Sequence, residues 1–418
     1  MPRLPALGFL PALGFLPALG FLPALGFLPA LGFLLACTIG SGVAQAAPYT
    51  PQSDDAVLER LPFKASAAEG RELRELRRAL AQQPQNLERA LALARRYFDL
   101  AGAEGDPRYV GYAEAAIRPW SQGAEPPAEI LVMRALLRQY RHEFDAALAD
   151  LARAAQSDPG NAEIWSWRSA IALVQADYAG ARAACDKLAP IASALLATAC
   201  SAAVDGLTGK SAQAYAVLSG ALANRPDADA ELKLWIQTRL AEMALRQGKD
   251  ELAERHFKAG LALGVTDGFI LAAYADFLLD RGRPAEVVPM LRDWERSDIL
   301  LLRLALAEQA AGLAGAVAHI AMLKERFDAS ALRGDKLHLQ EEARFHLHLL
   351  GDAPGALRLA AENYQVQREP RDARILLEAA LAAKDYAAAQ PALDWMRRSG
   401  YEDPAYTRLA RELRAGAK

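Results

Sequence analysis

Apolar residues recur every three or four positions along the chain from residue 69 onward, in segments of 12–15 residues. Leu73, Leu76 and Leu80, for example, are spaced i, i+3 and i+7 and share one face of a helix. No segment in this part of the sequence shows sustained alternation with β-branched enrichment, so we expect no strands. The pattern predicts an all-α body over residues 69–418.

Small residues mark a repeat within this helical pattern. They recur at intervals of 34, 34, 33, 39, 34, 30, 39 and 33 residues, a regularity that unrelated helices of a bundle do not keep. We predict nine helix hairpins over residues 87–400, with end helices over 73–80 and 406–413. The recurring small residues are Ala113, Ala147, Ala181, Ala214, Ala253, Val287, Val317, Ala356 and Ala389.

Residues 128–161 show how a unit resembles the tetratricopeptide repeat (TPR). That family has large residues at positions 4, 17 and 24 of a 34-residue unit, small ones at 8, 20 and 27, and Pro at 32. Counted from Ala128, the matching residues here are Leu131, Ala135, Phe144, Ala147, Leu151, Ala154 and Pro159. The resemblance implies a right-handed α-solenoid of about nine TPR-like hairpins with capping helices at its ends.

The first 46 residues resemble an export signal. Residues 5–34 are five perfect copies of Pro-Ala-Leu-Gly-Phe-Leu, and Arg3 is the one charge before residue 54. A positive start, an apolar run and the small-x-small sequence of residues 44–46 are typical of a secretory signal peptide. We predict cleavage after Ala46, an extended linker over 47–68, and the solenoid over 69–418.

Two alternatives to simple cleavage are open. Residues 34–37, Leu-Leu-Ala-Cys, resemble a bacterial lipobox, which would make Cys37 the lipidation site of an outer-membrane lipoprotein. A permanent span is disfavoured because a Pro at every sixth residue interrupts helical hydrogen bonds. Each reading exports the body, so we expect it in the periplasm, with no membrane span in the mature chain.

Composition excludes several classes of function. A net charge of −3 and a pI of about 6.1 give no basic face for nucleic acid.

Gly209, Lys210 and Ser211 resemble the end of a phosphate loop, but Val204 stands where the motif needs Gly. His338, Glu342 and His346 follow one another by four residues, so the outer two lie too far apart to share a zinc ion. We expect a solvated face there, no catalytic set, no metal and no cofactor.

Cys185 and Cys200 fall on consecutive helices of the predicted array. An oxidising compartment permits a disulfide between them. Along the predicted helices the two cysteines are about one turn out of register, which favours two buried thiols. The sequence leaves both states, a disulfide and two free thiols, open.

The resemblance also implies a partner-binding groove. In TPR arrays the first helix of each hairpin lines a concave surface, mainly through positions 2, 5, 6, 9, 12 and 13. Carried over position by position, these select Met133, Tyr140, Trp167, Trp235, Arg239, Glu242, Arg246, Phe269, Asp276, His338, Glu342 and Phe345. Exposed aromatic side chains beside Arg are typical of binding surfaces, although such residues also pack between neighbouring units.

These features favour a non-enzymatic scaffold that binds a protein or peptide partner of the bacterial cell envelope. One alternative is an α/α-toroid enzyme acting on glycans, which would close on itself and focus acidic residues into a central cleft. The other is a lipid-anchored structural spacer. The repeat pattern predicts an open curved ribbon without a convergent acid pair.

Overall fold

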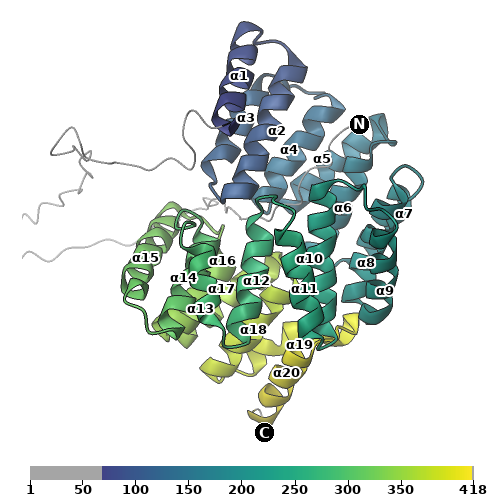
Figure 1. Ribbon diagram of the computed structural model, residues 1–418. Coiled ribbons are helices and arrows are strands. Elements are labelled where there is room, and N and C mark those ends of the chain that lie inside the picture. Colours follow the sequence, from purple (N-terminus) through teal and green to yellow (C-terminus); the bar gives the residue numbers. More distant parts are fainter. Residues whose placement is uncertain (1–67, 417–418) are drawn as a thin grey trace, which may run out of the picture. The chain divides into compact units, whose positions relative to one another are not determined.

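The computed structural model describes residues 68–416, and the predicted signal peptide, linker and Cys37 lie outside this range. Every regular element within it is a helix (Figure 1). The first half contains α1 (Ala68–Gln82), α2 (Leu87–Glu104), α3 (Arg108–Ser121), α4 (Ala128–Tyr140), α5 (Phe144–Ser157), α6 (Ala162–Val174), α7 (Tyr178–Leu188), α8 (Ala194–Leu207), α9 (Ser211–Ala223) and α10 (Ala230–Arg246).

The second half continues in the same style. It contains α11 (Asp250–Leu261), α12 (Gly268–Asp280), α13 (Pro284–Leu291), α14 (Asp298–Ala310), α15 (Gly315–Arg333), α16 (Leu339–Phe345), the π-helix η1 (His346–Leu350), α17 (Ala353–Val366), α18 (Pro370–Ala383), the 3₁₀ turn η2 (Ala387–Ala389), α19 (Gln390–Ser399) and α20 (Pro404–Gly416). No helix in residues 68–416 combines the length and apolar character needed to cross a bilayer.

Consecutive helices pack as hairpins from α2–α3 through α18–α19, and α1 and α20 flank the series. Within the described residues this gives nine hairpins between two end helices (Figure 1). Asn86 and Asp177 show how a helix of the array begins: each side chain accepts a backbone hydrogen bond from the first turn of the following helix. The predicted fold class, an all-α solenoid of TPR-like hairpins, is confirmed.

The recurring small residues lie where helices cross closely. Ala113, Ala147, Ala181 and Ala253 have no solvent-exposed surface, as close packing at a helix crossing requires. Val317 is an exception, because 77% of its surface is exposed. Its neighbour Ala316 is buried instead, so the predicted register was wrong by one residue on α15. The repeat length varies around α15, so the spacing of small residues alone did not determine which residue lies at the helix crossing.

The first helices of the hairpins contact one another in sequence, α4 with α6, α6 with α8, and onward to α16 with α18. This continuous series forms the inner wall of the array, as Figure 1 shows for α6, α10 and α12. α20 extends the wall, because it packs against α18.

The array does not stay open, contrary to the sequence-based expectation. The Arg368 amide donates to the Val174 carbonyl over 2.8 Å, and Trp395 Nε1 donates to the Tyr178 hydroxyl over 2.8 Å. Helices at the C-terminal end therefore return to α6 and α7. Gly209 adds a close approach: a Cβ there would lie 3.1 Å from the Gly400 carbonyl oxygen. Repeat periodicity describes contacts between neighbouring units and carries no signal for this closure.

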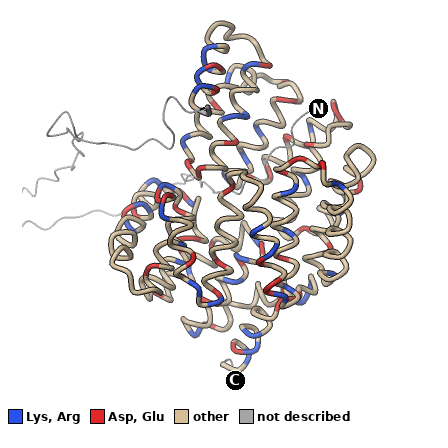
Figure 2. Tube along the Cα trace, viewed as in Figure 1, with Lys and Arg blue, Asp and Glu red and all other residues tan. Residues whose placement is uncertain are grey.

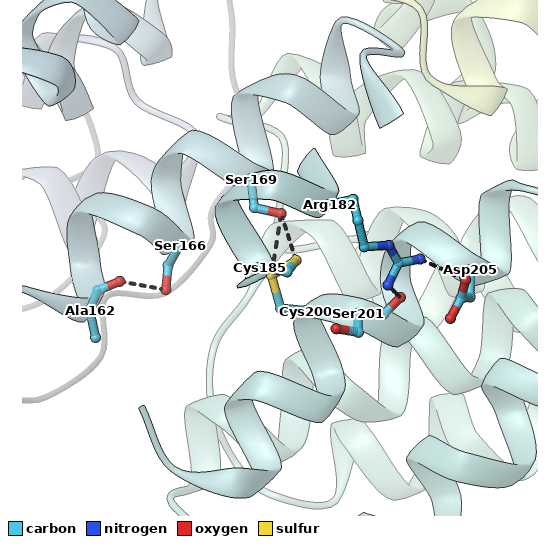
Figure 3. The surroundings of a disulfide bond; sticks show 8 residues. All are labelled: Ala162, Ser166, Ser169, Arg182, Cys185, Cys200, Ser201 and Asp205. Atoms are coloured by element: carbon cyan, nitrogen blue, oxygen red, sulfur yellow. Dashed lines mark hydrogen bonds and ion pairs between the residues drawn. A yellow bond between two sulfur atoms is a disulfide. The ribbon is translucent and has the colours of Figure 1, made fainter. Parts of the chain in front are cut away.

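A disulfide joins Cys185 of α7 to Cys200 of α8, with 5.7 Å between their Cα atoms (Figure 3). The Ser169 hydroxyl lies 3.3 Å from each sulfur atom. Helical hydrogen bonds continue past the end of α7, from the Ala192 amide to the Leu188 carbonyl. The consecutive helices α7 and α8 thus bring both cysteines within bonding distance, so the reading as two thiols was wrong.

Candidate functional site

A cavity of about 480 Å³ lies inside the array, and we call it the interior cavity. Its lining comes mainly from α4, α6, α8, α10, α12, α14, α16, α18 and α20. Leu188 of α7, Asp250 of α11, His348 of η1 and short connecting segments complete it. Figure 2 marks acidic and basic positions along these helices. The charged lining residues are Arg239, Glu242, Arg246, Asp250, Asp276, Asp280, Arg281, Arg303, Arg344, Glu369, Arg371, Arg374, Glu378 and Asp403, and His348 lies among them.

Asp276 of α12 is held by two guanidinium groups. Arg303 Nη2 lies 2.9 Å from its Oδ2, and Arg344 Nη2 lies 2.9 Å from its Oδ1. Burial acts to raise the pKa of Asp276, but the two guanidinium groups hold that pKa well below its usual range. Arg303 is buried and also lies 3.6 Å from Glu341. This cluster joins α12, α14 and α16 at the wall of the interior cavity.

A second cluster is built on α10. Glu242 lies 2.9 Å from Arg239 Nη1 and 3.6 Å from Arg246 Nη2, so one carboxylate serves two guanidinium groups. Arg239 also lies over Trp235, 6.0 Å from the ring centroid, and over Phe269 of α12, at 5.0 Å. Such stacking fixes the plane of a guanidinium group while its edge can still donate hydrogen bonds.

A third cluster crosses the interior from α18 to α12. Arg374 contacts Asp280 at 2.6 Å and Glu378 at 2.7 Å. Burial acts to raise the pKa of Glu378, but hydrogen bonding with His348 and attraction to Arg374 lower it to about 2. Asp403 lies in the same part of the lining, and burial raises its pKa although it accepts backbone hydrogen bonds from Ala405 and Tyr406. Arg374 thus joins α18 to α12 at the cavity.

The structure brings together seven of the twelve predicted groove residues. They line the interior cavity from three of the inner helices, as the TPR resemblance implied for the concave face. These residues are Trp167, Trp235, Arg239, Glu242, Arg246, Phe269 and Asp276.

The other five do not line the interior cavity. Met133, Tyr140 and Phe345 are buried against neighbouring helices, and Tyr140 packs edge-on to Phe98 at 6.4 Å. His338 lies 3.8 Å from Asp298, and Glu342 is largely buried beside His346. The solvated face predicted for His338 to His346 was therefore wrong. No group of three or more potential metal ligands occurs among residues 68–416.

Sequence reasoning missed the charged lining of the later hairpins. Arg303, Arg344, Arg371 and Arg374 come from α14, α16 and α18, where the TPR pattern is weak. The register assigned to α16 selected His338, Glu342 and Phe345 and passed over Arg344. The available signal was an Arg on successive inner helices, each near an acidic residue. Because the pattern is weak there, this signal could not be distinguished from ordinary solvated charge.

No protein-family model matches this chain, and no curated protein matches it. Three solved structures that it resembles are the APC/C hetero-tetramer Cut9–Hcn1 (14% identity, 79% of this chain and 86% of that chain, TM-score 0.38), Naa15/Naa10 bound to HypK-THB (16%, 83% and 56%, 0.30) and the P58(IPK) TPR domain (13%, 77% and 95%, 0.20). These scores are low, so the fold assignment rests on the hairpins themselves.

Proposed function

We propose that this protein is a non-enzymatic interaction scaffold of the bacterial cell envelope, which holds a segment of a partner protein at its inner surface. The observation that carries this proposal is the convergence of nine helices on one cavity lined by aromatic and arginine side chains. Aromatic residues and Arg supply most of the binding energy in protein interfaces, because they bury large areas and make directed hydrogen bonds.

Two features support the cell envelope as its location. The sequence before residue 47 has the order of a secretory signal, and Cys185 and Cys200 form a disulfide. Disulfides persist in oxidising compartments such as the bacterial periplasm and are rare in the cytosol. We place the body in the periplasm, and lipidation at Cys37 would add an outer-membrane anchor.

The charges of the interior favour binding over glycan hydrolysis. A glycosidase needs one carboxyl group with a raised pKa as general acid and a second carboxylate across the bond. The pKa of Asp276 is lowered by Arg303 and Arg344, and that of Glu378 by His348 and Arg374, so each carboxylate is held in its charged form. Asp403 has a raised pKa but caps α20.

Photo-crosslinking in the native envelope tests the scaffold function. A benzophenone amino acid replaces Trp235 in the interior cavity in one variant and Val317 on α15 in a matched variant. We expect a reproducible crosslinked envelope protein from position 235 and none from position 317. Crosslinks from position 317 alone, or none from either position, would contradict the proposal.

A further inference from the structure

We propose that the wall of the interior cavity formed by α10, α12 and the start of α18 binds a carboxylate carried on an apolar body. Its centre is Phe269, over which two guanidinium groups lie: Arg239 at 5.0 Å from the ring centroid and Arg371 at 5.2 Å. Helices that are far apart in the sequence thus present two positive groups at one aromatic ring.

The guanidinium groups of this wall share their carboxylate partners. On this wall Arg239, Arg246 and Arg371 lie beside Glu242, Asp276 and Glu369. Glu242 serves both Arg239 and Arg246, and Glu369 lies 2.7 Å from Arg371. Two further acidic residues lie behind: Glu341 is 3.6 Å from Arg303, and Asp267 caps α12 by accepting the Ile270 amide hydrogen bond. A carboxylate from outside would give the shared guanidinium groups a second partner.

Buried N–H groups in the lining point to the same chemistry. Arg239 Nε and Trp167 Nε1 are buried and have no hydrogen-bond partner, and Gln139 Nε2 is a third such atom. Guanidinium and indole nitrogens can only donate hydrogen bonds. A ligand that satisfies them must therefore carry acceptor atoms, and a buried donor without an acceptor is costly enough to favour such a ligand.

Apolar side chains next to these donors define the rest of the ligand. Trp235, Leu173, Leu207 and Met243 line the interior cavity together with Arg239. The volume of about 480 Å³ falls within the usual size of small-molecule sites, about 300–1,000 Å³. A ligand whose charged head group contacts Arg239 and Arg371 and whose hydrophobic body contacts the apolar side chains would match this lining.

The same chemistry can come from a free organic acid or from an acidic side chain of a partner segment. Isothermal titration calorimetry of the full mature protein separates the two sources. One arm uses 4-phenylbutyrate and its neutral amide. The other uses the blocked peptide Leu-Glu-Leu-Glu-Leu and its counterpart with Gln in place of Glu.

We expect at least one carboxylate probe to bind in the millimolar range or tighter, and its neutral counterpart to bind at least about tenfold more weakly. Binding by phenylbutyrate alone assigns a free acid, and binding by the peptide alone assigns a partner segment. A change in tryptophan fluorescence that is lost in a Trp235→Phe variant reports the same event, because Arg239 lies over that indole ring.

Two variants locate the site. Arg239→Gln should weaken binding at least about tenfold while its circular dichroism spectrum stays that of the folded protein, and exposed Arg292→Gln should bind as the unsubstituted protein does. The proposal is overturned if no carboxylate probe binds in the millimolar range, if the neutral probes bind equally well, or if Arg239→Gln leaves binding unchanged. The scaffold function is tested separately by crosslinking at position 235, so each idea can fail alone.

Discussion

The inner helices α4 and α10 occupy the same place in their hairpins but have opposite surroundings. Met133 and Tyr140 of α4 are buried in apolar packing, whereas Trp235, Arg239 and Glu242 of α10 line the interior cavity. The aromatic rings of Phe98, Tyr140 and Trp167 pack together at the α4 end. Position in the repeat therefore selects the inner face, and packing against neighbouring helices decides whether a residue on that face is buried or lines the interior cavity.

The comparison predicts different responses to loss of one inner side chain. Asp276→Ala would leave the guanidinium groups of Arg303 and Arg344 without their main carboxylate, so we expect a loss of about 3–5 kcal/mol in the free energy of unfolding. Urea denaturation followed by circular dichroism measures it. Asp394→Ala removes the partner of exposed Arg397 and should cost less than about 1 kcal/mol. Equal effects of the two variants would refute the buried cluster.

The disulfide at the junction between these two regions should contribute almost as much. Cys185 and Cys200 close a segment of 15 residues, for which chain entropy predicts about 3 kcal/mol. Unfolding measured with and without reductant should show this difference. A Cys185→Ala, Cys200→Ala double variant should show no response to reductant. If reductant has no effect on the unsubstituted protein, the bond is absent.

The close helix crossings of the α4 region predict a smaller effect. Ala147→Leu places a larger side chain where the native residue is fully buried, so we expect a loss of about 1–3 kcal/mol. Ala149→Leu, on the exposed face of the same α5 helix, is the matched control and should be near neutral. Thermal unfolding of both variants checks the difference. A neutral Ala147→Leu would mean that α4 and α5 do not cross closely there.

The smallest effect on stability is expected at the contact between α19 and α7, where the C-terminal helices return to the earlier hairpins. Trp395→Phe removes the hydrogen bond from Nε1 to the Tyr178 hydroxyl and should cost about 1 kcal/mol. A double-mutant cycle with Tyr178→Phe isolates the pair. We expect the double variant to be more stable than the sum of the two single effects predicts. Strict additivity would show that the two side chains do not interact.

The sequence was sufficient for the hairpins because their signal is local and repeated. Ala147 and Ala181 stand 34 residues apart, each fixing a helix crossing within its own unit. The candidate site needed contacts between distant units. Trp395 meets Tyr178 across 217 residues, and Arg246 lies over the ring of Tyr401 from another hairpin. Such pairs follow no period, so neither the closure nor the arginine lining of the later hairpins could be predicted.

The central claim is that the C-terminal helices return to α6 and α7 and line one side of the interior cavity. Spin labels at Lys210→Cys and Arg398→Cys test it directly, because their neighbours Gly209 and Gly400 approach closely. The labelled protein also carries Cys37→Ala, and the native disulfide does not react with the label. Double electron–electron resonance should give one narrow distribution at the short limit of the method. A broad distribution at long distances would show an open ribbon and contradict the account.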